Sequence, residues 1–206
     1  MRRIEAAPPI EQNANTIRIG QTQDDDLYRS ISINYELTVP EDTRVRSRIG
    51  SGRVTINHVQ GPVDVSNGSG GVRLRQIKGD IKATAGSGGI DIEDAGAGLE
   101  ARLGSGGIGI RGVQGMVRVR AGSGGIRIEG QPLKPWDLHA GSGGIDMRVV
   151  GETPFDLDAS SGSGGINNTQ PVSAIGASSR GRLQGKVRGG GAAVQLVAGS
   201  GGIRIQ

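Results

Sequence analysis

A Gly-Ser-Gly triplet that returns at nearly constant spacing constrains this 206-residue chain more than any other feature. Its serines are Ser51, Ser69, Ser87, Ser105, Ser123, Ser142, Ser163 and Ser200. The first four intervals are 18 residues, the next two are 19 and 21, and the last, of 37, spans about two periods with one degenerate copy between. A unit of this size cannot bury a hydrophobic face alone, so the array predicts a stacked solenoid.

Within one repeat, residues 104–121, apolar side chains occupy every second position. Ile108 and Ile110 follow the glycine turn, and Val117 and Val119 follow a short break. This period of two predicts short strands that each bury one face, while the glycine content opposes helix. We therefore expect an all-β fold, a single parallel β-solenoid with about 18 residues per coil. Parallel crossovers favour a right-handed coil, although left-handed hexapeptide solenoids share this coil length.

Aligning the repeats on their serines predicts the core as files of side chains running along the stack. One file holds Val54, Val72, Ile90, Ile108, Ile126, Ile145 and Ile166, and a second holds Ile56, Leu74, Ile92, Ile110, Ile128 and Met147. The other strand contributes Val63, Ile81, Leu99, Val117 and Trp136, with Val65, Ala83, Ala101, Val119 and Leu138 beside them. Such a core is narrow and almost purely aliphatic.

Three outward files carry charges whose sign alternates from coil to coil. They are Asn57, Arg75, Glu93, Arg111, Glu129 and Arg148; Thr55, Arg73, Asp91, Gly109, Arg127 and Asp146; and Asp64, Lys82, Glu100, Arg118 and Asp137. Each exposed pair contributes only about 0.2–1 kcal/mol. Together the files disfavour a slip by one coil, so they fix the register without any ligand.

The Gly-Ser-Gly-Gly corner has a structural explanation of the same kind. Glycine permits positive φ and close backbone approach, and we expect the serine hydroxyls to bond the backbone or one another. A phosphate-binding loop is the alternative. Because no Walker lysine, dinucleotide spacing or following helix is present, the structural interpretation is favoured.

Composition limits the environment of the chain only weakly. It has no cysteine, so neither a disulfide framework nor a thiolate metal site is expected. No apolar run reaches 18 residues, so no membrane span is predicted in this chain. Met1-Arg2-Arg3 is basic but no apolar segment follows, so no signal peptide is visible.

The chain divides into residues 1–48, an N-terminal arm with capping strands, and residues 49–206, one continuous solenoid domain. Residues 31–39 alternate cleanly between apolar and polar side chains and predict a strand. Ile17 and Ile19 predict a shorter one. This composition differs from that of the repeats, as expected of a capping unit.

After Asn168 the repeat weakens, with a loop predicted over 177–182, and then resumes with Leu183 and Val187. The chain ends in a fresh corner at residues 199–206. We expect this last coil to lie open at the end of the stack, unless residues 168–190 fold over it or a partner pairs with it. An open coil has unpaired backbone groups and would favour self-association.

No catalytic, cofactor-binding or metal-binding residue is predicted. His58 and His139 lie several coils apart, and each is expected on the surface. Asp24, Asp25 and Asp26 read as a solvated acidic turn. The acidic residues Asp91, Glu93 and Asp94 resemble calcium-binding solenoids only faintly, because arginine replaces aspartate in neighbouring coils.

Enzymes on β-solenoids gather several carboxylates in one groove, whereas here each carboxylate has a basic neighbour. Alternating charge and an aromatic content of 2% also argue against nucleic-acid binding. The basic residues Arg180, Arg182, Lys186 and Arg188 read as a solvated loop.

Trp136 and Phe155 align in the same file when the repeats are superimposed. We expect two rings stacked in or beside the core. An aromatic platform for sugars is the alternative, and it is weaker because only two rings take part.

The strand ending Leu37-Thr38-Val39-Pro40, the tandem GSGGI-x-I units and the closing region 183–203 resemble a bacterial β-strand-repeat family of unknown function that carries an adhesin label. The resemblance covers roughly residues 30–206. The family commonly has Gly-Ser-Gly-Asp where this chain has Gly-Ser-Gly-Gly, so no role of that aspartate is carried over. The resemblance implies a β-solenoid in the bacterial cell envelope or outside the cell, although a cytoplasmic location stays open.

We therefore expect a non-enzymatic structural or interaction module, an adhesin-like solenoid without cofactors. Its predicted partner is a protein or glycan surface, or a second copy that binds through the open C-terminal coil. Nucleic acid is not expected as a partner. The alternative is a self-assembling filament protein like the bactofilins, which also stack short aliphatic coils.

Overall fold

The computed structural model describes residues 10–20, 33–174 and 181–206 and divides the chain into two compact units, Met1–Thr38 and Val39–Gln206. In the first unit, β1 (Ile10–Asn13) and β2 (Thr16–Ile19) form an antiparallel hairpin in which Ile10 pairs with Ile19. Both strands are mostly exposed. This unit is therefore a two-stranded ribbon with no core among its described residues.

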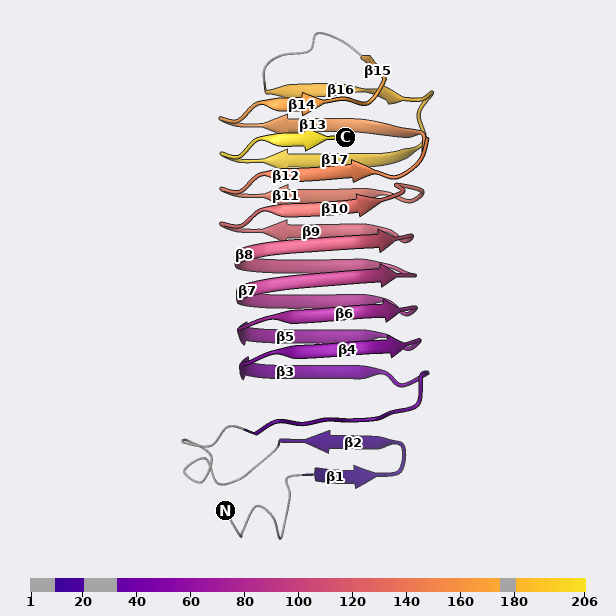
Figure 1. Cartoon of the computed structure of the whole chain (residues 1–206), viewed down its shortest axis with the longest axis vertical. Coiled ribbons are helices and arrows are strands. Elements are labelled where there is room, and N and C mark those ends of the chain that lie inside the picture. Colours follow the sequence, from indigo (N-terminus) through magenta and orange to yellow (C-terminus); the bar gives the residue numbers. More distant parts are fainter. Residues whose placement is uncertain (1–9, 21–32, 175–180) are drawn as a thin grey trace. The chain divides into compact units, whose positions relative to one another are not determined.

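The second unit is a β-solenoid, as the repeats predict (Figure 1). Its strands are β3 (Val45–Ser51), β4 (Val54–Val59), β5 (Val63–Ser69), β6 (Val72–Ile77), β7 (Ile81–Ala95), β8 (Leu99–Val113), β9 (Val117–Ala121), β10 (Ile126–Gly130), β11 (Trp136–Ala140), β12 (Ile145–Val149), β13 (Phe155–Ser161), β14 (Ile166–Asn168), β15 (Val172–Ala174), β16 (Arg182–Val187), β17 (Ala192–Ala198) and β18 (Ile203–Ile205). No described residue is helical.

Each coil contributes one strand to each of two sheets. The β5 face contains β3, β5, the first halves of β7 and β8, and then β9, β11, β17 and β13. The β6 face contains β4, β6, the second halves of β7 and β8, and then β10, β12, β18 and β14. In Figure 1 the β6 face lies toward the viewer and its strands run to the right as the chain climbs, so the coil is right-handed.

The predicted inward files form one continuous core between the two sheets. The register pairs Val72 with Ile90 and Ile90 with Ile108, and all three side chains are at most 2% exposed. Trp136 fills its part of the core because the position facing it is a glycine: a Cβ on Gly130 would lie 3.4 Å from the ring. The large ring and the missing side chain compensate for each other in volume.

Backbone groups, rather than serine hydroxyls, hold the Gly-Ser corners together. Ser123 N donates to the carbonyl oxygen of Gly104 at 2.9 Å, and Ser142 N donates to that of Gly122 at 2.9 Å. The predicted hydroxyl bonds are absent from the corner serines that the structure describes, and these serines are exposed. Glycine is required because a Cβ on Gly106 would overlap the carbonyl oxygen of Gly88, and Gly106 itself has a φ of 120°.

The prediction of an open C-terminal coil is wrong. β17 pairs in parallel with β11 on one side and β13 on the other, while β18 lies between β12 and β14. The last coil of the chain is therefore inserted between two earlier ones (Figure 1). The insertion buries Val194, Leu196, Ile203 and Ile205, and it removes the basis for self-association through a free C-terminal edge.

The weakened segment after Asn168 caps the stack instead. β16 runs antiparallel to β13, and β15 adds antiparallel to β16. Val187 is fully buried against Phe155, so the cap extends the core by one layer. The solenoid is thus parallel through its coils and antiparallel at its C-terminal cap.

The strand predicted over 31–39 is not formed in its described part. Residues 33–40 carry no ladder pairing, and Ile33, Tyr35, Leu37 and Val39 are each 36–59% exposed. Ile31 and Ser32 lie outside the described residues. Alternation indicates which positions share a face, but a strand also needs a partner for its backbone groups.

Candidate functional site

The three predicted charge files lie in register, as the alternation requires. On the β6 face, Arg75 Nε lies 2.9 Å from Glu93 Oε2 in the next coil, and Arg111 Nη1 lies 3.5 Å from Glu93 Oε1. Further pairs between coils are Arg127 with Asp146, Arg148 with Glu129, Arg46 with Asp64, and Arg118 with Asp137, at 3.6–3.8 Å. Most of the charge on these files is therefore compensated by an adjacent coil.

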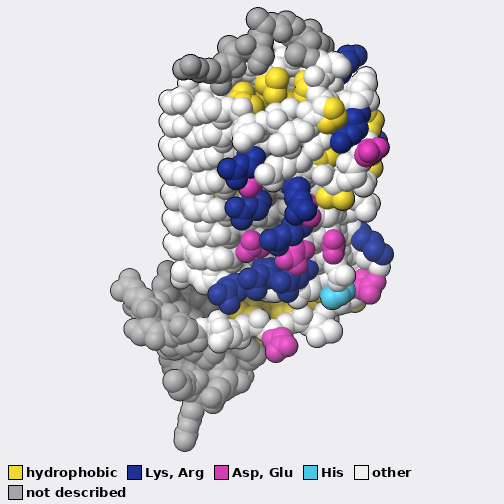
Figure 2. Space-filling view, turned by 45° about the horizontal axis from the view of Figure 1, so that its top comes forward, with side chains coloured by type: hydrophobic (Ala, Val, Ile, Leu, Met, Phe, Trp, Pro, Cys, Tyr) yellow, Lys and Arg dark blue, Asp and Glu magenta, His cyan; other side chains and the backbone are white. Residues whose placement is uncertain are grey.

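Apart from Arg53 in the first coil, the Gly-Ser corners form a rim without charged or hydrophobic side chains. Figure 2 shows this rim as white ridges beside a band in which blue and magenta side chains are intermixed. At some of these positions neither the backbone conformation nor the available space requires glycine. Gly107, for example, has open space where a Cβ would stand and no positive φ, and the first coil carries Arg53 at the matching position. The rim therefore lacks side chains even at positions where the stacked backbone would accept one.

The two large aromatic rings lie in the core, as expected. Trp136 and Phe155 are 1% and 0% exposed, which rules them out as a sugar-binding platform. Their predicted shared file is wrong, however. Trp136 aligns with Val194 and, through it, with Leu157, whereas Phe155 aligns with Ala192, so the two rings lie two positions apart in the register.

Two of the residues considered as a calcium site, Glu93 and Asp94, have structural roles in the coil. Glu93 pairs with two arginines, as above. Asp94 has a φ of 58° and is the last residue but one of its strand, in the same left-handed conformation as His58 and Gln76. Asparagine and aspartate tolerate this conformation better than most residues. Among the described residues, no group of three or more histidine, cysteine or acidic side chains could hold a metal ion. Asp24, Asp25 and Asp26 lie outside them.

The basic segment predicted as a loop belongs largely to the cap. Arg182 and Lys186 lie on β16, where Arg182 Nη2 is 3.6 Å from Asp158 Oδ2. Arg188 Nη1 donates to Gln170 Oε1 at 2.6 Å. Arg180 lies outside the described residues. The predicted loop is therefore wrong for Arg182 and Lys186, which lie on a strand, and Arg182 and Arg188 contact neighbouring segments.

A fourth outward file on the β5 face breaks the alternation. Its successive members are Arg48, Ser66, Thr84, Arg102, Arg120, His139, Val197 and Ser160. Three basic residues thus stand on three neighbouring strands, β8, β9 and β11. We call Arg102, Arg120 and His139 the basic file. Like charges placed directly opposite one another are destabilising, so stacking alone does not explain it.

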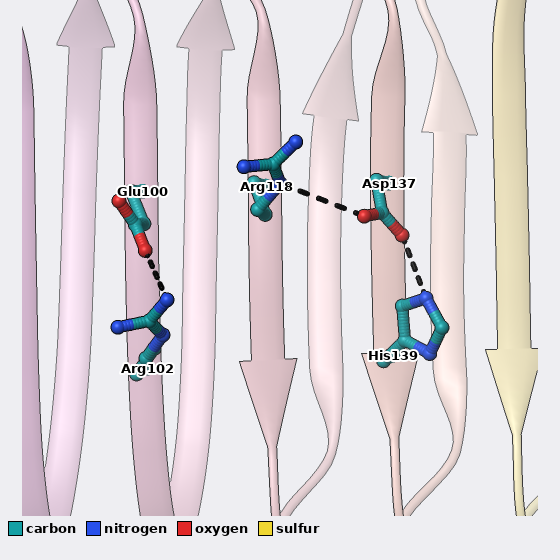
Figure 3. Close-up of polar contacts among 5 residues, drawn as sticks. All are labelled: Glu100, Arg102, Arg118, Asp137 and His139. Atoms are coloured by element: carbon teal, nitrogen blue, oxygen red, sulfur yellow. Dashed lines mark ion pairs between the residues drawn. The ribbon is translucent and has the colours of Figure 1, made fainter.

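Figure 3 shows the carboxylates beside two members of the basic file, Arg102 and His139. Arg102 Nη2 lies 2.6 Å from Glu100 Oε1, two residues earlier on the same strand, and His139 Nε2 lies 2.7 Å from Asp137 Oδ1. Asp137 also faces Arg118 at 3.6 Å, so one carboxylate is shared by two basic groups. Arg120 makes no ion pair with a described residue and is exposed.

The basic file borders a shallow depression of about 610 Å³. Arg102, Arg120, His139 and Thr84 line one side, and the corner glycines Gly104, Gly122 and Gly141 line the other. Because the glycines raise no side chain, a ligand can approach the guanidinium groups from the rim. A second shallow depression, of about 750 Å³ on the β6 face, is lined by the alternating charges Asp91, Arg127, Asp146 and Arg204.

The sequence contains the signal for the basic file, although the sequence analysis did not find it. Each member follows a charge-file residue by two positions: Arg102 after Glu100, Arg120 after Arg118, and His139 after Asp137. Writing out every outward position, rather than the three alternating ones, reveals it. The sequence predicts correctly that His139 faces outward, but the prediction did not group it with Arg102 and Arg120.

A family model described as Toastrack DUF4097 matches residues 8–206. No curated protein and no solved structure shows significant similarity to the chain. The family match supports the expected β-repeat family of unknown function. Separately, no helix long and apolar enough to cross a membrane is present in the described part of the chain.

Proposed function

This chain belongs to the Toastrack DUF4097 family, and we propose that it is an adhesin-like interaction module of the bacterial cell envelope, acting without catalysis. Its β5 face binds a partner on or near the cell surface. The envelope location follows from the resemblance noted in the sequence. The binding role follows from the surface of the solenoid.

The observation that carries the proposal is the basic file. A solenoid that needed charges only for register would alternate them in every outward file, as the other three do. Here Arg102, Arg120 and His139 stack basic side chains on adjacent strands beside a bare rim. Sites that tolerate local destabilisation are typical of functional surfaces.

The arrangement also bears on the filament alternative. Coil-on-coil polymerisation needs free parallel edges at both ends of the stack. At the C-terminal end of the β5 face, antiparallel β16 and β15 cover β13, and on the β6 face the outermost strand is the three-residue β14. These features favour a binding module over a bactofilin-like filament.

The test is binding of the full-length protein to bacterial envelope material, measured by sedimentation with isolated cell walls and membranes. We expect retention on this material, reduced by Arg120→Gln and unaffected by the charge-matched Arg111→Gln on the β6 face. Failure of the wild-type protein to bind, or regular filaments in electron micrographs of the pure protein, would contradict the proposal.

A further inference from the structure

We infer that the basic file is a binding site for the oxyanion groups, carboxylate or phosphate, of an acidic glycan that lies along the β5 face. The inference rests on the proposed function and names the ligand of the same surface. It starts from the register: Arg102 pairs with Arg120 across β8 and β9, and Arg120 with His139 across β9 and β11. Neighbouring strands lie about 4.8 Å apart, so the three basic groups follow one line along the stack.

The local charge balance leaves room for an anion. The six side chains are Arg102, Arg118, Arg120, His139, Glu100 and Asp137. Three guanidinium groups against two carboxylates give a net charge of +1 with neutral histidine and +2 with protonated histidine. Both carboxylates are already engaged, Glu100 by Arg102 and Asp137 by Arg118 and His139. The excess charge therefore resides on Arg120.

The geometry supports recognition rather than simple attraction. Arg102 and His139 each contact a carboxylate on their own strand (Figure 3), and the register places Arg120 on the strand between them. A guanidinium group with no competing partner offers a planar fork of donors that matches carboxylate or phosphate oxygens. The central arginine thus supplies the main contact and its neighbours supply flanking donors.

The surroundings favour a hydrophilic polymer over a protein surface. Protein interfaces usually centre on aromatic or other large apolar side chains. The depression is lined by Thr84, alanines, glycines and the basic file, and its two larger apolar residues are Leu103, which is 4% exposed, and the half-buried Val197. The large exposed hydrophobic side chains Met116, Leu133 and Val150 lie outside this lining. A shallow, open surface beside a bare rim admits an extended chain that carries acidic groups.

The experiment uses the full-length protein and titrates it, in low salt, with polygalacturonate, poly-glutamate, inorganic phosphate and neutral dextran. We expect polygalacturonate to bind and dextran not to bind. Arg120→Gln lowers the affinity for polygalacturonate about tenfold, since a charged hydrogen bond is lost. Arg111→Gln removes the same charge from a paired position on the β6 face and changes the affinity by less than about twofold.

Each titration has an outcome that would contradict the proposal. An equal loss in Arg120→Gln and Arg111→Gln would show attraction by net charge alone and would overturn the site. Binding of phosphate without binding of either polymer would contradict the proposal that the ligand is an acidic glycan. Binding of poly-glutamate as tight as that of polygalacturonate would contradict it as well. NMR spectra of both variants verify the fold, and Arg120→Lys, which keeps the charge but loses the planar fork, should recover only part of the affinity.

The result separates this inference from the proposed function. Binding to envelope material that survives Arg120→Gln would retain the function and reject the site. Polygalacturonate binding without retention on envelope material would retain the site and reject the adhesin-like role.

Discussion

The first coils of the solenoid, β3 to β8, and the later ones, β9 to β18, solve the same stacking problem differently. In the first half the coils follow one another in chain order at strict 18-residue spacing. In the second half the spacing changes, aromatic rings enter the core, and the last coil is inserted between two earlier ones. Regular spacing therefore coincides with sequential stacking, and irregular spacing with rearrangement.

The backbone differs between the halves as well. The corner glycines Gly52, Gly70, Gly88 and Gly106 have φ values of 114–124°, whereas those of the later corners, from Gly124 on, have no positive φ. His58, Gln76, Asp94 and Gly112 add a left-handed residue at the end of each early strand on the β6 face. Against β10, the register shifts past Gly112 at Glu129 and Gly130, so the later coils drop this bulge.

Deleting residues 189–206 tests the comparison most severely. The deletion removes the buried Ala198 and four larger buried aliphatic side chains, and it leaves β11 and β13 without their shared partner. At about 1.5–3 kcal/mol for each of the four, we expect a loss of more than about 5 kcal/mol. Urea denaturation and hydrogen exchange measure this, with protection lost in β9–β16 and kept longer in β4–β8. Deleting residues 1–38, a separate compact unit, is the control. Unchanged exchange in β11 and β13 would contradict the interlock.

Trp136→Ala compares the packing of the two halves. Truncating this fully buried ring opposite Gly130 leaves a large cavity and should cost about 3–5 kcal/mol. Val63→Ala, in the same file on β5 of the first half, removes less volume and should cost clearly less. Chemical denaturation monitored by circular dichroism gives both values, and equal losses would mean that the later core relaxes around the missing ring.

Gly106→Ala examines the early corners. Its Cβ would overlap the Gly88 carbonyl oxygen, and its φ of 120° suits glycine alone, so we expect a loss of about 2–3 kcal/mol. Gly107→Ala, the adjacent residue, meets open space and should stay within about 0.5 kcal/mol. Similar melting temperatures for the two variants would show that the corner yields to a side chain.

Glu93→Lys has the smallest expected effect. It places a third positive charge between Arg75 and Arg111 on neighbouring coils and should cost about 1 kcal/mol at low salt. Glu152→Lys, an exposed turn position without an ion pair to a described residue, is the matched control. Added salt should narrow the difference. A difference that persists at high salt would indicate packing rather than charge.

The positions of most residues in the site could be predicted from the sequence, but which of them form ion pairs could not. The alternating files, the buried rings and the surface position of His139 follow from the repeat, because one phase of the period always faces the same way. The basic file follows from the same rule applied to one more position. What sequence reasoning lacked was pairing: only the side-chain geometry shows that Glu100 and Asp137 are engaged while Arg120 is free of ion pairs with described residues.

The sequence by itself determined the coil, because a strict period of alternating aliphatic residues and tight glycine corners has one way to bury its faces. Only the tertiary structure decided the order of the last coils. Residues 131–135 and 150–154 are both five-residue connections, yet the first leads to the adjacent coil and the second skips one. Five extended residues reach about 16 Å, farther than two strand spacings of about 4.8 Å. The connection therefore permits either path, and the path taken is fixed by contacts distant in sequence, the pairing of β17 with both β11 and β13.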